Sequence, residues 1–175
     1  MTLKNLAKSS KASQEWFELW QMLIAVAMLK PRRIVEIGVH RGGFPQTLRQ
    51  AFPEALVVGV DLDFSQLEFT DFTAIAGDSR KPSTVEAVRD VLKGEPVDFL
   101  FIDGDHNYEV CKSDFELFSP LVRPGGVIGF HDTNGRGIEG VTVDKFLAEL
   151  DERHAYHSVE IRAGRDTPGT RLIWV

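Results

Sequence analysis

Polar residues that can bind metals, hydroxyl groups or protons follow five short apolar runs of this 175-residue chain. A carboxylate can hold a metal or accept hydrogen bonds, and an imidazole can also move a proton near neutral pH. Turn chemistry would explain any one of these sites, but it does not require a carboxylate after every run. The residues concerned are Glu36, Asp61, Asp78 with Ser79, Asp103 with His106, and His131 with Asp132.

The first of these sites contains a glycine-bearing turn. Gly38 and Gly42 would let the backbone come close to a ligand, and a helix N-terminus after them would favour a negatively charged group. In the glycine fingerprint of dinucleotide-binding turns, the third and sixth positions are also glycine. Here these positions are His40 and Gly43. The turn therefore argues against a nicotinamide cofactor without excluding it.

Asp61 follows Gly38 by 23 residues and ends the second apolar run. An acidic side chain in that place can accept hydrogen bonds from both hydroxyl groups of a ribose. The alternative is a role as a helix or loop cap. The glycine turn upstream favours the ribose role, which would suit any cofactor that carries an adenosine.

These sites need a scaffold, and the apolar pattern predicts one. Strands and helices alternate along most of the chain, which is typical of a mostly parallel sheet with helices on both faces. The last two strands are joined by a short turn and should form an antiparallel hairpin. In such sheets, ligands bind outside the carboxyl ends of the strands. We expect strands over 33–38, 56–62, 72–76, 97–102, 127–130, 157–162 and 170–175, and helices over 14–29, 45–51, 83–93, 108–121 and 143–150.

Size and composition limit the alternatives. The length suits one domain, with a flexible arm over 1–12 and the folded unit over 13–175. A net charge of -6 disfavours nucleic acid as a partner. The longest uncharged apolar run, 22–29, is too short to span a membrane, and the start of the chain lacks the apolar region of a secretory signal. With Cys111 as its single cysteine, the chain is expected to be cytoplasmic.

Five segments of the chain carry a resemblance to a known family. EIGVHRGG (36–43), VGVDLD (58–63) and GDS (77–79) look like the motif series of class I S-adenosylmethionine-dependent methyltransferases. DFLFIDGDHNY (98–108) and RPGGVIGFHD (123–132) are more particular. They resemble methyltransferase family 24, which is similar to catechol-type and macrolide-sugar O-methyltransferases and to proteins named cephalosporin hydroxylases. The resemblance covers about 14–175 and implies a single-domain, Rossmann-like sheet of seven strands.

The resemblance implies a role for each residue of the cofactor half. The methionine part of S-adenosylmethionine would lie on the turn, the ribose on Asp61, and the adenine against Leu62 and the third strand end. Asp103 would border the cofactor as well as the reacting groups. The cofactor residues implied are Glu36, Gly38, His40, Gly42, Asp61, Leu62, Asp78, Ser79 and Asp103.

The resemblance also implies a chemical half. Asp103 and Asp132 match positions that bind a divalent metal in metal-dependent relatives, and His106 matches a general base in sugar-modifying relatives. One position departs from the pattern, because His131 stands where those relatives carry an acid or amide. Mg²⁺ prefers oxygen ligands, whereas a histidine favours Mn²⁺, Fe²⁺ or Zn²⁺. Without a metal, His106 alone could take the proton; its alternative role is a cap for the next helix.

Three functions therefore remain open. The first is methylation of a hydroxyl group on a small molecule, with or without a divalent metal. The second is an NAD(P)-dependent oxidoreductase on a similar sheet, and the third is a nucleotide-binding protein without catalysis. The sequence does not name the acceptor, and an exposed face of the first long helix would suit a homodimer.

Overall fold

A computed structural model of the chain describes residues 1–135, 137–153 and 156–175. The helices are α1 (Leu3–Ser9), α2 (Trp16–Met28), α3 (Gly43–Ala51), α4 (Pro82–Val91), α5 (Tyr108–Phe118), the 3-10 turn η1 (Ser119–Leu121) and α6 (Val143–Arg153). The strands are β1 (Arg33–Ile37), β2 (Leu56–Asp61), β3 (Thr73–Ala76), β4 (Val97–Ile102), β5 (Val122–His131), β6 (His157–Ile161) and β7 (Thr170–Trp174). Among these described residues, no helix is long and apolar enough to cross a membrane.

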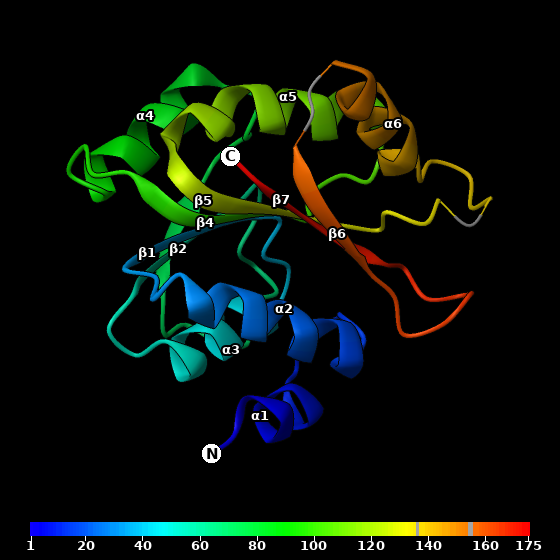
Figure 1. The fold of residues 1–175 in the computed structure, drawn as a ribbon. Coiled ribbons are helices and arrows are strands. Elements are labelled where there is room, and N and C mark those ends of the chain that lie inside the picture. The colour runs from blue at the N-terminus through cyan, green and yellow to red at the C-terminus, as the bar shows by residue number, and fades with distance from the viewer. Residues whose placement is uncertain (136, 154–155) are drawn as a thin grey trace.

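The strands form one seven-stranded sheet in the order β3-β2-β1-β4-β5-β7-β6. Strands β1 to β5 run parallel to one another, and β7 is antiparallel to both β5 and β6. The predicted sheet and its antiparallel C-terminal hairpin are therefore confirmed. The hairpin reaches the sheet through its second strand, so β6 forms the edge (Figure 1).

Helices cover both faces of the sheet, as predicted. Figure 1 shows α1, α2 and α3 on one side and α4, α5 and α6 on the other. Each side has its own apolar core, because alternate side chains of a strand point to opposite faces. Strand β4 lies at the centre and is buried along its whole length, and its last four residues are all apolar, as expected for a strand covered on both faces.

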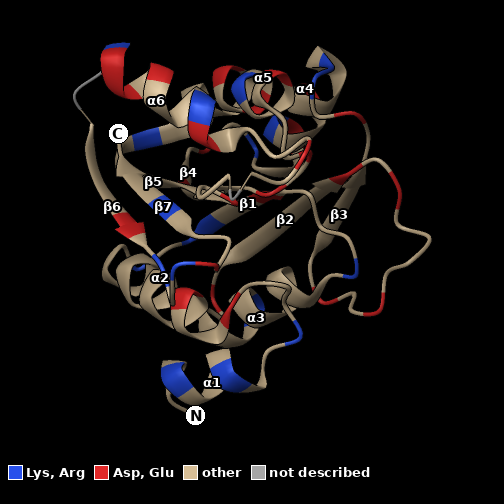
Figure 2. Ribbon diagram, turned by 90° about the vertical axis from the view of Figure 1, so that its right-hand side faces the viewer, with Lys and Arg blue, Asp and Glu red and all other residues tan. Residues whose placement is uncertain are grey.

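The segment predicted as a loose arm, 1–12, contains helix α1. Leu6 and Ala7 of this helix are buried against α2 and α3. Both charged side chains of α1 are lysines (Figure 2), and their ammonium groups lie about 5 Å from the ring centres of Trp20 and Trp16. Two buried apolar residues in a short polar segment are a weak sequence pattern, and their partners come from later helices.

Candidate active site

A cavity of about 710 Å³ lies at the carboxyl ends of the parallel strands. It takes residues from the ends of β1 to β5, which is the edge where an open α/β sheet binds ligands. All but one of the residues predicted from the sequence line it; the exception is Gly42. The predicted residues that line it are Glu36, Gly38, His40, Asp61, Leu62, Asp78, Ser79, Asp103, His106, His131 and Asp132.

The glycine turn after β1 is shaped by close backbone contact. Gly38 has a positive φ of 89°, and a Cβ atom there would lie 2.1 Å from the carbonyl oxygen of Asp103. The ends of β1 and β4 can meet only because this side chain is absent. Gly42 also has a positive φ and precedes α3, where a Cβ would lie 2.6 Å from the carbonyl oxygen of Phe69. Gly42 therefore shapes the turn from outside the cavity wall.

Asp61 holds the same turn from the end of β2. Its Oδ2 accepts hydrogen bonds from the backbone N–H groups of Val39 and His40, both at 2.8 Å. His40 has a φ of 52°, a left-handed conformation that is unfavourable for a residue with a side chain. The two hydrogen bonds stabilise that conformation. This backbone role was not visible in the sequence. Among the described residues, Oδ1 of Asp61 accepts a single hydrogen bond, from the N–H of Asp63 at 3.3 Å.

Glu36 lies beneath the cavity and is only 1% exposed. Burial raises the pKa of its carboxyl group well above the usual range, and the negative charges of Asp103 and Asp61 raise it further. Its Oε2 is buried without a hydrogen-bond partner among the described residues. This oxygen is therefore available to a polar group of a ligand.

The end of β3 contributes a carboxylate that is already paired. The side chain of Arg80 donates to both oxygens of Asp78, each at 2.9 Å, and this hydrogen bonding lowers the pKa of Asp78. Ser79 lines the cavity beside this pair. Leu62, the residue after β2, also lines the cavity and is 70% exposed, which makes it an apolar surface open to a ligand.

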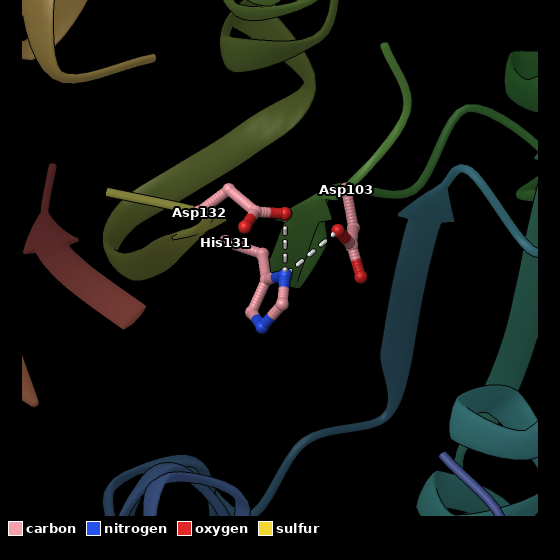
Figure 3. A group of neighbouring side chains, drawn as sticks. All are labelled: Asp103, His131 and Asp132. Carbon is pink, nitrogen blue, oxygen red and sulfur yellow. Dashed lines mark hydrogen bonds and ion pairs between the residues drawn. The ribbon is translucent and has the colours of Figure 1, made fainter. Parts of the chain in front are cut away.

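Asp103, His131 and Asp132 form a compact group at the other end of the cavity (Figure 3). Nδ1 of His131 lies 3.1 Å from a carboxylate oxygen of Asp103 and 3.1 Å from one of Asp132. Burial opposes the charged form of His131, but the attraction of Asp103 and the hydrogen bonds to both carboxylates raise its pKa to about 10. Conversely, burial opposes ionisation of Asp132, but hydrogen bonds from His106 and His131 hold its pKa well below the usual range.

His106 joins this group from the loop after β4. Its Nδ1 lies 3.0 Å from Oδ2 of Asp132, and its Nε2 lies 4.0 Å from Oδ1 of Asp103. The hydrogen bond with Asp132 raises the pKa of His106, although burial works against it. The side chain is 42% exposed, so one face of the ring can reach a ligand.

The donor atoms of Asp103, His131 and Asp132 show whether these residues fit a metal ion. One ligand atom from each of Asp103, His131 and Asp132 falls within 4.8 Å of the others, which fits a single ion. Nδ1 of His131 faces both carboxylates, whereas its Nε2 is buried without a partner among the described residues. An ion would therefore replace the proton on Nδ1, because a metal-bound imidazole must be neutral. Two carboxylates and one imidazole suit a divalent transition ion.

Some residues of the site were missed from the sequence. Residues 11–14 line the cavity, and the first two of them, Lys11 and Ala12, belong to the segment predicted as a flexible arm. The side chain of Gln14 reaches Asp103 across 89 positions of the chain. Pro168 closes the cavity from the β6–β7 turn. A glutamine beside a predicted helix start has no local feature that marks such a contact.

Sequence comparison decides the family. The family 24 methyltransferase domain matches residues 35–133, which include every strand end of the cavity. The chain belongs to this methyltransferase family. An uncharacterized protein of Sinorhizobium fredii is 31% identical over 156 residues, covering 77% of this chain and 16% of its own length. Demethylmacrocin O-methyltransferase of Streptomyces fradiae is 29% identical over 108 residues, covering 57% of this methyltransferase chain and 27% of its own length.

Solved structures show the same fold. A provisionally assigned caffeoyl-CoA O-methyltransferase of Staphylococcus aureus has a TM-score of 0.75 at 15% identity, covering 100% of this methyltransferase chain and 93% of its own. MycE of the mycinamycin pathway, bound to Mg, S-adenosylhomocysteine (SAH) and mycinamycin VI, has a TM-score of 0.70 at 18% identity, covering 98% and 54%. The predicted methyltransferase fold is thus confirmed. The chain spans at most half the length of the curated relatives that it matches.

Proposed function

We propose that this methyltransferase transfers a methyl group from S-adenosylmethionine to a hydroxyl group of a small molecule. The observation that carries the proposal is one cavity with two chemically different ends. One end offers a glycine turn with Asp61 and Leu62 beside it, and the other offers Asp103, His106, His131 and Asp132. Relatives described as O-methyltransferases, some of them bound to S-adenosylmethionine or SAH, support this assignment.

The cofactor would bind along the turn after β1. The unpaired oxygen of Glu36 and the backbone at Gly38 and His40 suit the polar methionine end. Oδ1 of Asp61 would accept from the ribose, and Leu62 would pack on the adenine, with Asp78 and Ser79 at its edge.

The acceptor hydroxyl must lose its proton as its oxygen attacks the methyl carbon. Asp132 accepts a hydrogen bond from Nδ1–H of His106, which leaves Nε2 of the neutral ring to take that proton. The new O–CH₃ bond forms as the S–CH₃ bond breaks, and the sulfonium becomes the neutral thioether of SAH. Because the pKa of His106 is raised, this base becomes neutral, and so able to accept the proton, at a higher pH than an ordinary imidazole would.

Asp103, His131 and Asp132 would hold a divalent metal. When bound, such an ion lowers the pKa of a coordinated hydroxyl and orients it for attack. Mg²⁺ is the ion in MycE. The imidazole in this donor set favours Mn²⁺, Fe²⁺ or Zn²⁺ over Mg²⁺.

Titration calorimetry with S-adenosylmethionine, SAH and NAD tests the cofactor. We expect binding of the first two and none of NAD; tight NAD binding with no response to the methyl donor would favour an oxidoreductase. A panel of hydroxylated small molecules, assayed by SAH release with and without EDTA, then tests catalysis. Asp103→Ala and His106→Ala are assayed in the same way. If the wild-type protein binds the cofactor but, like these two variants, methylates no acceptor, a non-catalytic role is favoured.

The assembly state is a separate proposal. Trp16, Ile24 and Met28 are exposed on α2 at four- and eight-residue spacings, so they share one side of the helix. This face would suit a homodimer. Light scattering during size-exclusion chromatography measures it, and a monomer at micromolar concentration would argue against it.

A further inference from the structure

The segment before α2 is seated against the cavity by several contacts. The hydroxyl groups of Ser10 and Thr47 lie 2.6 Å apart, which ties the segment to α3. The backbone N–H of Ala12 donates to Oγ of Ser10 at 3.0 Å. A Cβ on Gly43 would lie 2.2 Å from the carbonyl oxygen of Lys11, so the segment and the start of α3 are in direct contact. Residues 11–14 are therefore part of the cavity wall.

Gln14 extends from this wall into the chemical half of the site. Its side chain is nearly buried, with 7% exposure, and its Nε2 donates to Oδ2 of Asp103 at 2.6 Å. The other oxygen of Asp103, Oδ1, lies 3.1 Å from Nδ1 of His131. The two oxygens of this carboxylate thus have different partners, and rotation about its Cβ–Cγ bond would break both contacts.

The amide orientation follows from chemistry. An ionised carboxylate only accepts hydrogen bonds, so the amide must present its NH₂ group to Asp103. The remaining atom, Oε1 of Gln14, is buried without a partner among the described residues. A buried unpaired acceptor is unfavourable. If Gln14 only held the segment in place, a side chain without an unpaired buried oxygen would stabilise the fold more.

We propose that Gln14 is a positioning residue that fixes the Asp103 carboxylate so that Oδ1 faces His131 and the metal position. The inference rests on the proposed function in assigning Asp103 to the metal and the acceptor. Hydrogen bonds from outside the ligand set orient metal-binding carboxylates, and their loss typically weakens metal binding about 10–100-fold. Gln14 would act through Asp103 and without touching the ion.

The test measures metal binding alone, without cofactor or acceptor. Mn²⁺ is titrated into the full chain, and free Mn²⁺ is measured by electron paramagnetic resonance. Gln14→Ala and Gln14→Met, which keeps a similar length but cannot donate, should both weaken Mn²⁺ binding about 10-fold or more. Gln50→Ala, at an exposed glutamine of α3, should bind like the wild-type protein. Thermal melting of each variant checks that it is folded.

A second measurement does not depend on a metal. The ¹⁵N resonances of the imidazole groups, recorded at one pH on the metal-free protein, report the contact between His131 and Asp103. Both Gln14 variants should shift the His131 signals and leave those of the exposed His157 unchanged. Unchanged His131 signals together with unchanged Mn²⁺ affinity would overturn the inference.

The two proposals can fail separately. If the wild-type protein binds no Mn²⁺, the metal part of the proposed function fails, and shifted His131 signals still support Gln14 as a positioning residue. If the wild-type protein binds Mn²⁺ and the Gln14 variants bind it equally well with unchanged His131 signals, the inference about Gln14 fails and the proposed function stands.

Discussion

The two halves of the cavity are built in different ways. The cofactor half depends on backbone contacts: Gly38 lets β1 meet β4, and Asp61 holds the turn in a left-handed conformation. The chemical half depends on side chains that hold one another by charge, with His131 between Asp103 and Asp132. A backbone-built site tolerates little change in shape, whereas a charge-built site depends on protonation and on bound ions. The two halves should therefore respond differently to substitution.

The largest expected effect is a loss of methyl transfer from a substitution in the chemical half of the cavity. Asp132→Asn removes the negative charge that both histidines contact, at 3.0 Å and 3.1 Å. We expect methyl transfer, measured as SAH release, to fall about 10²–10⁴-fold because the base loses its orienting carboxylate. S-adenosylmethionine affinity, measured by calorimetry, should change less than about threefold, since the backbone turn is intact.

Asp90→Asn is the matched control for that variant. Asp90 carries an exposed carboxylate on α4, and it does not line the cavity. Its activity should stay close to the wild-type value. An equal loss of cofactor affinity in Asp132→Asn would show that the two halves are not independent.

Gly38→Ala should break the cofactor half. The added Cβ would lie 2.1 Å from a backbone oxygen at a φ of 89°. Backbone shifts and left-handed strain together should cost about 3–5 kcal/mol in free energy of unfolding, measured with urea. In the folded fraction, S-adenosylmethionine binding should be lost.

Gly94→Ala is the control that separates the cost of left-handed backbone strain from the cost of a steric clash of the added Cβ. Gly94 also has a positive φ, of 73°, but a Cβ there would meet nothing within 4 Å. This variant should lose only about 1–2 kcal/mol. Equal losses in the two variants would mean that β1 can move away from β4 and that the turn is less constrained than the geometry indicates.

A third variant concerns a buried charge behind the cofactor half. Burial raises the pKa of Asp114 to about 6. The unfolded carboxyl group titrates near about 3.9, so the folded protein binds the proton more tightly and loses up to about 3 kcal/mol of stability as the pH rises from about 4 to about 6. Asp114→Asn should remove that loss. Urea unfolding at pH 4 and pH 7 measures it.

The exposed Glu116 of the same helix provides the control. Glu116→Gln should follow the wild-type dependence on pH, with a steeper loss than Asp114→Asn. Parallel curves for all three proteins would place the stability cost at another group.

Much of this comparison could be predicted from the sequence, because a parallel sheet gathers its strand ends at one edge. Asp61, Asp103 and Asp132 are far apart in the chain, yet each follows an apolar run, so their convergence follows from strand order. The helices of the C-terminal half followed from apolar periodicity in the same way. Residue type and spacing carry enough information for such features.

The missed features depend on contacts that no local pattern records. Helix α1 is stabilised by burial of Leu6 and Ala7 against α2 and α3, and its own composition is polar. Gln14 matters only because folding brings it to Asp103. The position of His131 between two carboxylates likewise depends on side-chain geometry. Sequence patterns placed the strand ends, and packing decided which side chains meet there.

The smallest expected effect concerns Leu62, and it tests whether this residue belongs to the cofactor half of the cavity. Leu62 is 70% exposed, so Leu62→Ala should leave the free energy of unfolding within about 0.5 kcal/mol of the wild-type value. If the adenine covers this side chain, the variant loses apolar contact only in the complex. S-adenosylmethionine affinity should then fall about fivefold, the equivalent of about 1 kcal/mol.

Val159→Ala, at a half-exposed residue of β6, is the control for loss of an exposed apolar side chain, and it should not change cofactor affinity. NAD carries the same adenine, so Leu62 does not distinguish the two cofactors by itself. The Leu62→Ala variant tests where the adenine lies. If its affinity for S-adenosylmethionine is unchanged, the adenine does not pack against Leu62. The adenosine would then lie nearer Ser79, and the exposed leucine would belong to the acceptor side of the cavity.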